Sequence, residues 1–110
     1  MSARRQELQA LLERHYRDAG WKVERHDDGT VRACGIGGVT WIGLAVVAED
    51  VDDDTFAARV LELSDQRMPK GELCPLELLP DPECADELWR VLERLRLNER
   101  GHVDVYSVAA

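Results

Sequence analysis

Three cysteines and three histidines are the residues of this sequence with the widest chemistry, because their side chains can bind metals or act as nucleophiles and bases. A structural zinc site normally takes its ligands in pairs that lie two to four residues apart. No two of the six residues have that spacing, and we therefore expect no metal site and no cofactor. The six are Cys34, Cys74, Cys84, His15, His26 and His102.

The thiols are considered first as nucleophiles, which need a base nearby in space. Cys84 falls on the apolar face of a predicted helix, and Cys34 lies in a predicted strand. Small buried hydrophobic side chains are expected at such positions. Cys74 stands beside Pro75, where neither pattern applies, and it stays open as a reactive group.

A second group of polar residues lies near the end of the chain. His102 and Tyr106 point to one side of a predicted strand, together with Asp104, because alternate residues share a face. With Cys74 they are the candidate groups for a small-ligand or catalytic pocket at the sheet end. A small enzyme or ligand-binding domain is therefore one functional hypothesis.

An acidic run, Asp50 to Asp54, contains four aspartates that could hold Ca²⁺ or Mg²⁺. An EF-hand loop would need glycine at its sixth position and glutamate at its twelfth, and both are missing. The run precedes a predicted helix, where carboxylates cap free N–H groups and favour the positive end of the helix dipole. We interpret it as a cap. Asp52 and Asp53 also supply acidic surroundings for a partner.

The three tryptophans are expected in the core or on a sheet face, whereas a tryptophan left exposed would mark a surface that binds another protein. Trp21 and Trp41 lie in predicted strands, whereas Trp89 follows Leu88 at the border of an apolar helix stripe. Trp89 is the preferred partner-binding residue. Trp41 is the second candidate.

Charge excludes some classes of partner. The net charge is −8, and residues 26–80 carry most of the excess, with four Lys or Arg against eleven Asp or Glu. Binding to nucleic acid or anionic lipid requires clustered cations. We therefore expect no nucleic-acid and no membrane partner, whereas a basic protein partner suits this balance.

Length and composition favour one domain spanning residues 1–110, large enough to bury a core. The longest apolar run, residues 39–48, is half of the roughly 20 residues that span a membrane, and no secretory signal pattern is present. Three widely spaced cysteines do not make a disulfide framework. We expect a soluble cytoplasmic protein with reduced thiols.

Hydrophobic periodicity predicts the elements. Apolar residues at helical spacing predict three helices, and alternation between turn signals predicts strands. Both faces of the strand at 39–48 are apolar, as in a central strand covered on two sides, although such a face also suits an interface. The predicted helices cover residues 3–19, about 55–68 and 81–97, and the predicted strands 21–26, 30–34, 39–48, 73–79 and 102–108.

The fold class is therefore α+β, a single small domain of order α-β-β-β-α-β-α-β. We expect a mixed, mainly antiparallel sheet packed with helices on at least one face. The first six elements resemble the core order of restriction-endonuclease-like nucleases. That resemblance implies an aspartate on the second strand and Glu-x-Lys on the third, but residues 30–34 and 39–48 contain no carboxylate. We reject the nuclease hypothesis.

The leading functional hypothesis is a non-catalytic interaction or regulatory module, such as an inhibitor or immunity-type protein. It would bind a protein partner, of basic character, through a sheet face or edge. The small enzyme or ligand-binding domain is the alternative. A homodimer that pairs an edge strand or the two-faced strand is compatible with both hypotheses.

Overall fold

The computed structural model describes residues 3–107 and contains one five-stranded sheet in the order β1-β2-β3-β4-β5. The first two neighbouring pairs are antiparallel and the last two are parallel. The sheet is mixed as predicted, but its pairings divide evenly, because each helical crossover adds a parallel pair. The strands are β1 (Lys22–Arg25), β2 (Thr30–Cys34), β3 (Thr40–Val46), β4 (Leu76–Pro80) and β5 (Val103–Val105).

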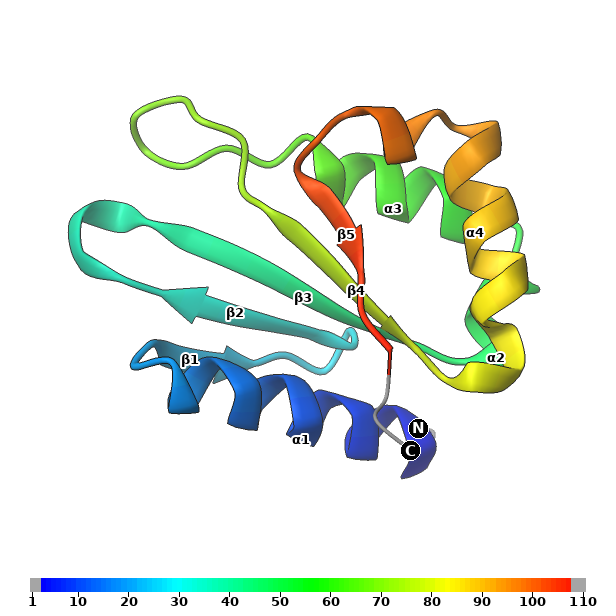
Figure 1. Ribbon diagram of the computed structural model, residues 1–110, viewed down its shortest axis with the longest axis horizontal. Helices are drawn as coiled ribbons and strands as arrows, with labels where there is room; N and C mark the ends of the chain where they lie inside the picture. The colour runs from blue at the N-terminus through cyan, green and yellow to red at the C-terminus, as the bar shows by residue number, and fades with distance from the viewer. Residues whose placement is uncertain (1–2, 108–110) are drawn as a thin grey trace.

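Helices cover both faces of this sheet (Figure 1). α1 lies on one face, and α3 and α4 lie on the other, with the short α2 between β3 and α3. The α-β-β-β-α-β-α-β order and the α+β class are confirmed. The helices are α1 (Ala3–Asp18), α2 (Ala48–Val51), α3 (Phe56–Ser64) and α4 (Ala85–Arg94), and three 3₁₀ turns are η1 (Ile36–Gly38), η2 (Pro82–Cys84) and η3 (Leu97–Glu99).

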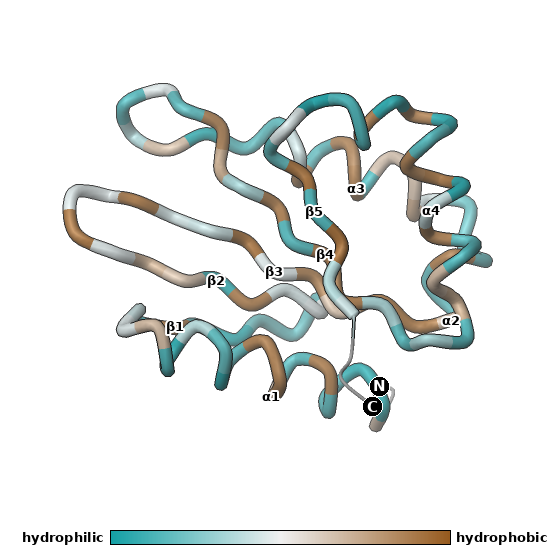
Figure 2. The backbone as a smooth tube through the Cα atoms, in the orientation of Figure 1, coloured by the Kyte–Doolittle hydropathy of each residue, from teal (hydrophilic) through white to brown (hydrophobic). Residues whose placement is uncertain are grey.

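β3 is the central strand and separates two hydrophobic cores. Ile42 and Leu44 belong to the core under α3 and α4, whereas Ala45 belongs to the core under α1. Figure 2 shows hydrophobic residues recurring along β3 and β4. The prediction of a strand covered on two sides is confirmed, because each face of the strand meets a different helical layer.

Gly43 allows α1 to approach the sheet closely. A Cβ atom at this position would lie 2.9 Å from the Tyr16 hydroxyl and 3.2 Å from a methyl group of Leu12. The Tyr16 hydroxyl would then have to shift, and the Leu12 methyl group would have to move by a few tenths of an ångström. The glycine in this apolar strand therefore positions Tyr16 over the sheet.

Several element ends differ from the predictions. β4 begins at Leu76, after Pro75, since proline has no N–H for the ladder. The predicted helix 81–97 begins as η2 and its α-helical part stops at Arg94, with Arg96 in the left-handed conformation at φ 60°. α3, which corresponds to the helix predicted at about 55–68, ends at Ser64, well before Pro69. Val108, the last residue of the predicted final strand, lies outside the described residues.

Within residues 3–107, none of the helices has the length and apolar character needed to cross a bilayer. Cys34, Cys74 and Cys84 are all unpaired.

Candidate functional site

Among residues 3–107, β5 forms one edge of the sheet, and its side away from β4 pairs with no other strand. The carbonyl of His102 accepts a hydrogen bond of 2.8 Å from the first amide of β4, and the amide of Tyr106 donates one of 2.8 Å to a β4 carbonyl. Alternate residues of a strand direct their main-chain groups to the same neighbour. Val103 and Val105 therefore direct their N–H and C=O groups away from β4, to the open edge.

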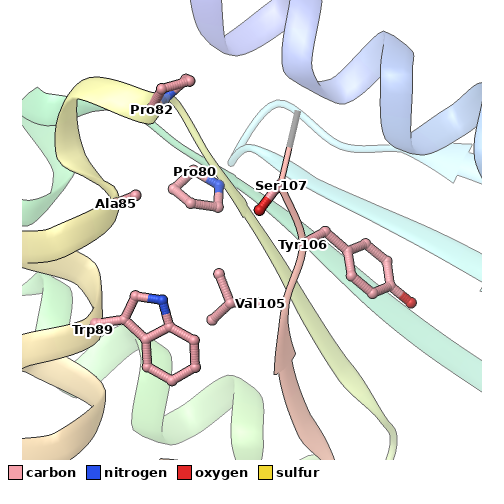
Figure 3. A pocket seen from close by; sticks show the side chains of 7 residues that line it. All are labelled: Pro80, Pro82, Ala85, Trp89, Val105, Tyr106 and Ser107. Carbon is pink, nitrogen blue, oxygen red and sulfur yellow. The ribbon is translucent and has the colours of Figure 1, made fainter. Parts of the chain in front are cut away.

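A hollow of about 210 Å³ lies between this strand and α4. Trp89 forms one wall, and its side chain is 43% exposed. Val105 points toward the indole, whereas the ring of Tyr106 points to the opposite side (Figure 3). We call the open edge of Val103–Val105 together with this hollow the β5 edge site. The hollow is lined by Pro80, Pro82, Ala85, Trp89, Val105, Tyr106 and Ser107.

α4 holds Trp89 in place because the helix is strongly amphipathic. Leu88 and Leu92 are buried in the core under the sheet, and Trp89 follows at the edge of that apolar stripe. The helix is tied to β3 at its start, where the Cys84 thiol lies 3.6 Å from the Val46 carbonyl and can donate to it. Burial, with the nearby carboxylates, raises the pKa of Cys84 to about 11, so the thiol stays protonated at neutral pH.

The other face of β5 looks toward α1 and is polar. Asp104 is exposed and pairs in register with Glu77 of β4. Glu77 is only 2% exposed, and its carboxylate accepts a 2.6 Å hydrogen bond from the buried Tyr16 hydroxyl of α1. The ring of His15 lies 5.5 Å from the ring of Tyr106, so α1 contacts the residue that follows β5.

Burial sets the ionisation of this pair. Loss of solvent raises the pKa of Glu77, and the negative charge of Asp104 raises it further, against opposing effects of the Tyr16 hydrogen bond and of His15. Burial also raises the pKa of Tyr16, and the adjacent Glu77 carboxylate adds to that shift. A tyrosine so disfavoured as an anion acts here as a hydrogen-bond donor.

Of the residues singled out from the sequence, Trp89 and Tyr106 line the hollow of the β5 edge site, although the ring of Tyr106 points away from Trp89. Cys74 is buried in the core under α3 and α4, and burial raises the pKa of its thiol. The Nε2 atom of His102 lies 2.7 Å from the Ser64 carbonyl of α3. Of Cys74, His102 and Tyr106, only Tyr106 lines the hollow beside Trp89, so the structure does not gather the three around it.

The remaining candidates lie elsewhere. Trp41 is half-buried and its ring lies 5.7 Å from that of Trp21. Asp52 and Asp53 line a separate hollow of about 240 Å³ between the α2–α3 turn and α4. Asp53 accepts hydrogen bonds of 2.8 and 2.7 Å from the amide and hydroxyl of Thr55, which lower its pKa and fix the turn before α3. Asp50 caps α2 by accepting a 3.0 Å hydrogen bond from the Val47 amide, whereas no side chain in the described part of the chain caps α3, so the cap predicted for that helix is not formed.

Glu77 and Tyr16 were not singled out from the sequence as a pair. The available signal was the lone acidic residue in Leu76–Leu79, a segment predicted as a strand with apolar neighbours on both sides. A carboxylate there must either reach solvent or find a buried donor. Among residues 3–107, no three His, Cys, Asp or Glu side chains are grouped so as to hold a metal ion.

Comparison with known proteins gives no assignment. The chain matches no protein-family model, and searches of curated proteins and of solved structures return no match.

Proposed function

We propose that this protein is a non-catalytic interaction module that binds an extended segment of a partner protein at the β5 edge site. The partner segment would add to β5 as a further strand and place side chains in the hollow beside Trp89. By occupying such a segment the module would regulate or inhibit the protein that carries it. We keep the cytoplasm as its proposed location, because its three cysteines are unpaired.

The observation that carries this proposal is the position of Trp89. A large aromatic side chain, 43% exposed, stands beside a hollow and next to main-chain groups that have no partner strand among residues 3–107. Strand addition uses main-chain hydrogen bonds for affinity and adjacent pockets for specificity. Both requirements are met within one short stretch of the surface.

A second copy of this chain is a less suitable occupant than a different protein. If two β5 strands paired along their whole length in the antiparallel direction, Asp104 of one copy would lie directly opposite Asp104 of the other. Like charges directly opposite each other destabilise a strand pair. The net charge of −8 on each copy adds to this repulsion.

The test is a selection of displayed random octapeptides against the wild-type protein, followed by affinity measurements on the enriched peptides. Replacement of Trp89 by alanine should weaken their binding by about thirtyfold, which corresponds to roughly 2 kcal/mol for a central aromatic contact. Leu11→Ala is the matched control, because Leu11 is 40% exposed on α1. Its affinity should equal that of the wild type.

Two results would overturn the proposal. One is that no peptide is enriched above background. The other is that the enriched peptides bind Trp89→Ala as tightly as they bind the wild-type protein.

A further inference from the structure

A strand added to β5 would meet two different surfaces, because its alternate side chains point to opposite faces of the sheet. On the α4 side these side chains would lie beside Val103, which is buried, and would meet the more exposed Val105 and Trp89, which line the hollow. On the α1 side the residue opposite Asp104 would lie about 5 Å away between Cβ atoms. The groups around Asp104 determine which side chain is favoured at that position of the added strand.

Those groups carry an excess of negative charge. Asp104 lies beside Glu77 in the parallel register, and the two carboxyl groups interact electrostatically. His15, Tyr16 and Tyr106 also lie on this face, and the ring of His15 lies 5.4 Å from that of Tyr16 and 5.5 Å from that of Tyr106. Within residues 3–107, neither lysine nor arginine forms an ion pair with Asp104.

The position is also accessible. Asp104 is exposed, and α1 packs mainly on β1, β2 and β3 and less on β4. A cationic side chain from an added strand would extend over β5 on the α1 face and reach the Asp104 carboxylate without being buried. An anionic side chain at the same place would face two carboxyl groups with no compensating cation.

From this arrangement we infer that the partner segment alternates apolar and basic residues, with a lysine or arginine opposite Asp104 and an aliphatic side chain on each side of it. This inference rests on the proposed function, since it describes the segment that the β5 edge site accepts. The aliphatic side chains pack against Val105 and Trp89, beside the buried Val103. The basic side chain supplies the charge that the α1 face of β5 lacks.

The experiment compares two blocked peptides, Ser-Thr-Val-Lys-Val-Thr-Ser and the same sequence with glutamate in place of lysine. Affinities are measured by titration of the β5 amide resonances in the wild-type protein and in four variants. The wild-type protein should bind the lysine peptide at least tenfold more tightly. Asp104→Asn should remove most of that preference, and Asp104→Lys should reverse it.

Glu62→Gln is the control for net charge, because it removes one exposed carboxylate on α3, which lies on the opposite face of the sheet. It should keep the preference of the wild type. If both peptides bind equally and both lose affinity with Trp89→Ala, the inference fails and the proposed function stands. If neither peptide binds the wild-type protein and the octapeptide selection is also empty, the proposed function fails. If the lysine peptide instead induces a dimer in light scattering, the single-strand addition is wrong.

Discussion

The two edges of the sheet differ in the way that they meet solvent. β1 presents three exposed charged residues, Lys22, Glu24 and Arg25, and the last of these is ion-paired at 2.8 Å with Glu13 of α1. β5 contains Val103, which is buried, and Val105, which is partly exposed, with the single charge of Asp104 between them. Charged side chains on an edge strand discourage the addition of another strand, and short aliphatic residues do not.

This difference indicates that charged side chains protect β1 against the addition of a further strand, and that β5 lacks most of this protection. β1 follows α1 in the chain and is joined to β2 by a tight turn, and α1 is the helix that packs on it. The β5 edge follows a helical crossover, which places the flank of α4 and Trp89 beside it. An open strand and an apolar wall in one place are what strand addition needs.

The strongest way to break this comparison is to remove one outward-facing amide from each edge. Val105→Pro deletes an N–H that points away from β4, so the ladder within the sheet keeps its hydrogen bonds. The proline ring also blocks the approach of an added strand, and we expect the affinity for selected peptides to fall at least about 100-fold, or roughly 2.7 kcal/mol.

Val23→Pro is the matched variant on β1. The amide of His26 donates to Thr30 of β2, so the alternation places the Val23 amide on the open side of β1. This variant should bind peptides as the wild type does. Thermal unfolding of both variants checks that they fold, and equal peptide binding by the two would contradict the assignment of the edges.

A smaller effect is expected when the protection of β1 is removed. The double variant Lys22→Val, Glu24→Val replaces opposite charges on the exposed face of this strand with aliphatic groups and leaves the net charge unchanged. Since the edge then resembles β5, we expect concentration-dependent self-association, measured by sedimentation at concentrations that span about a hundredfold.

The control for this experiment is Glu7→Val with Arg17→Val, a charge-neutral pair of substitutions on the exposed surface of α1. That variant should remain at the same molar mass as the wild type. Equal self-association of the two double variants would show that added apolar surface alone, and not the edge, causes it.

The helices and strands could be predicted from the sequence, because the spacing of apolar residues indicates which face of each element is buried. The double alternation of 39–48 correctly predicted a central strand, and the border position of Trp89 correctly predicted an exposed indole. The edges could not be predicted, because strand order depends on which way each crossover returns to the sheet. For the same reason the sequence left several strand pairings open.

The polar contacts were predicted least well. His102 and Tyr106 were placed on one side of a strand by their spacing, but β5 begins only at Val103, and His102 turns to the Ser64 carbonyl of α3. The Tyr16–Glu77 hydrogen bond joins residues 61 positions apart. No local pattern encodes a contact over that distance, although a carboxylate inside an apolar strand indicates that a partner must exist.

The smallest expected effect is on the free energy of unfolding. It compares two carboxylates, that of the buried Glu77 beside the β5 edge site and that of the exposed Glu24 on β1. Glu77→Gln keeps an acceptor for the Tyr16 hydroxyl and removes a carboxylate whose pKa is raised chiefly by burial. In the wild type the folded state therefore holds this proton more tightly than the unfolded state does. That contribution is complete below the ordinary pKa of the group and is lost as the pH rises through the raised value.

The variant should consequently gain about 1 kcal/mol in the free energy of unfolding at pH 7, and the gain should vanish near pH 4. Urea unfolding between pH 4 and pH 8 measures it. Glu24→Gln, on the exposed face of β1, should change the free energy of unfolding by less than about 0.5 kcal/mol at every pH. If Glu77→Gln instead lowers the free energy of unfolding at pH 7, the Glu77 carboxylate must have stabilising interactions in addition to its hydrogen bond with Tyr16. The polar face of β5 would then not hold the uncompensated charge on which its preference for a basic segment depends.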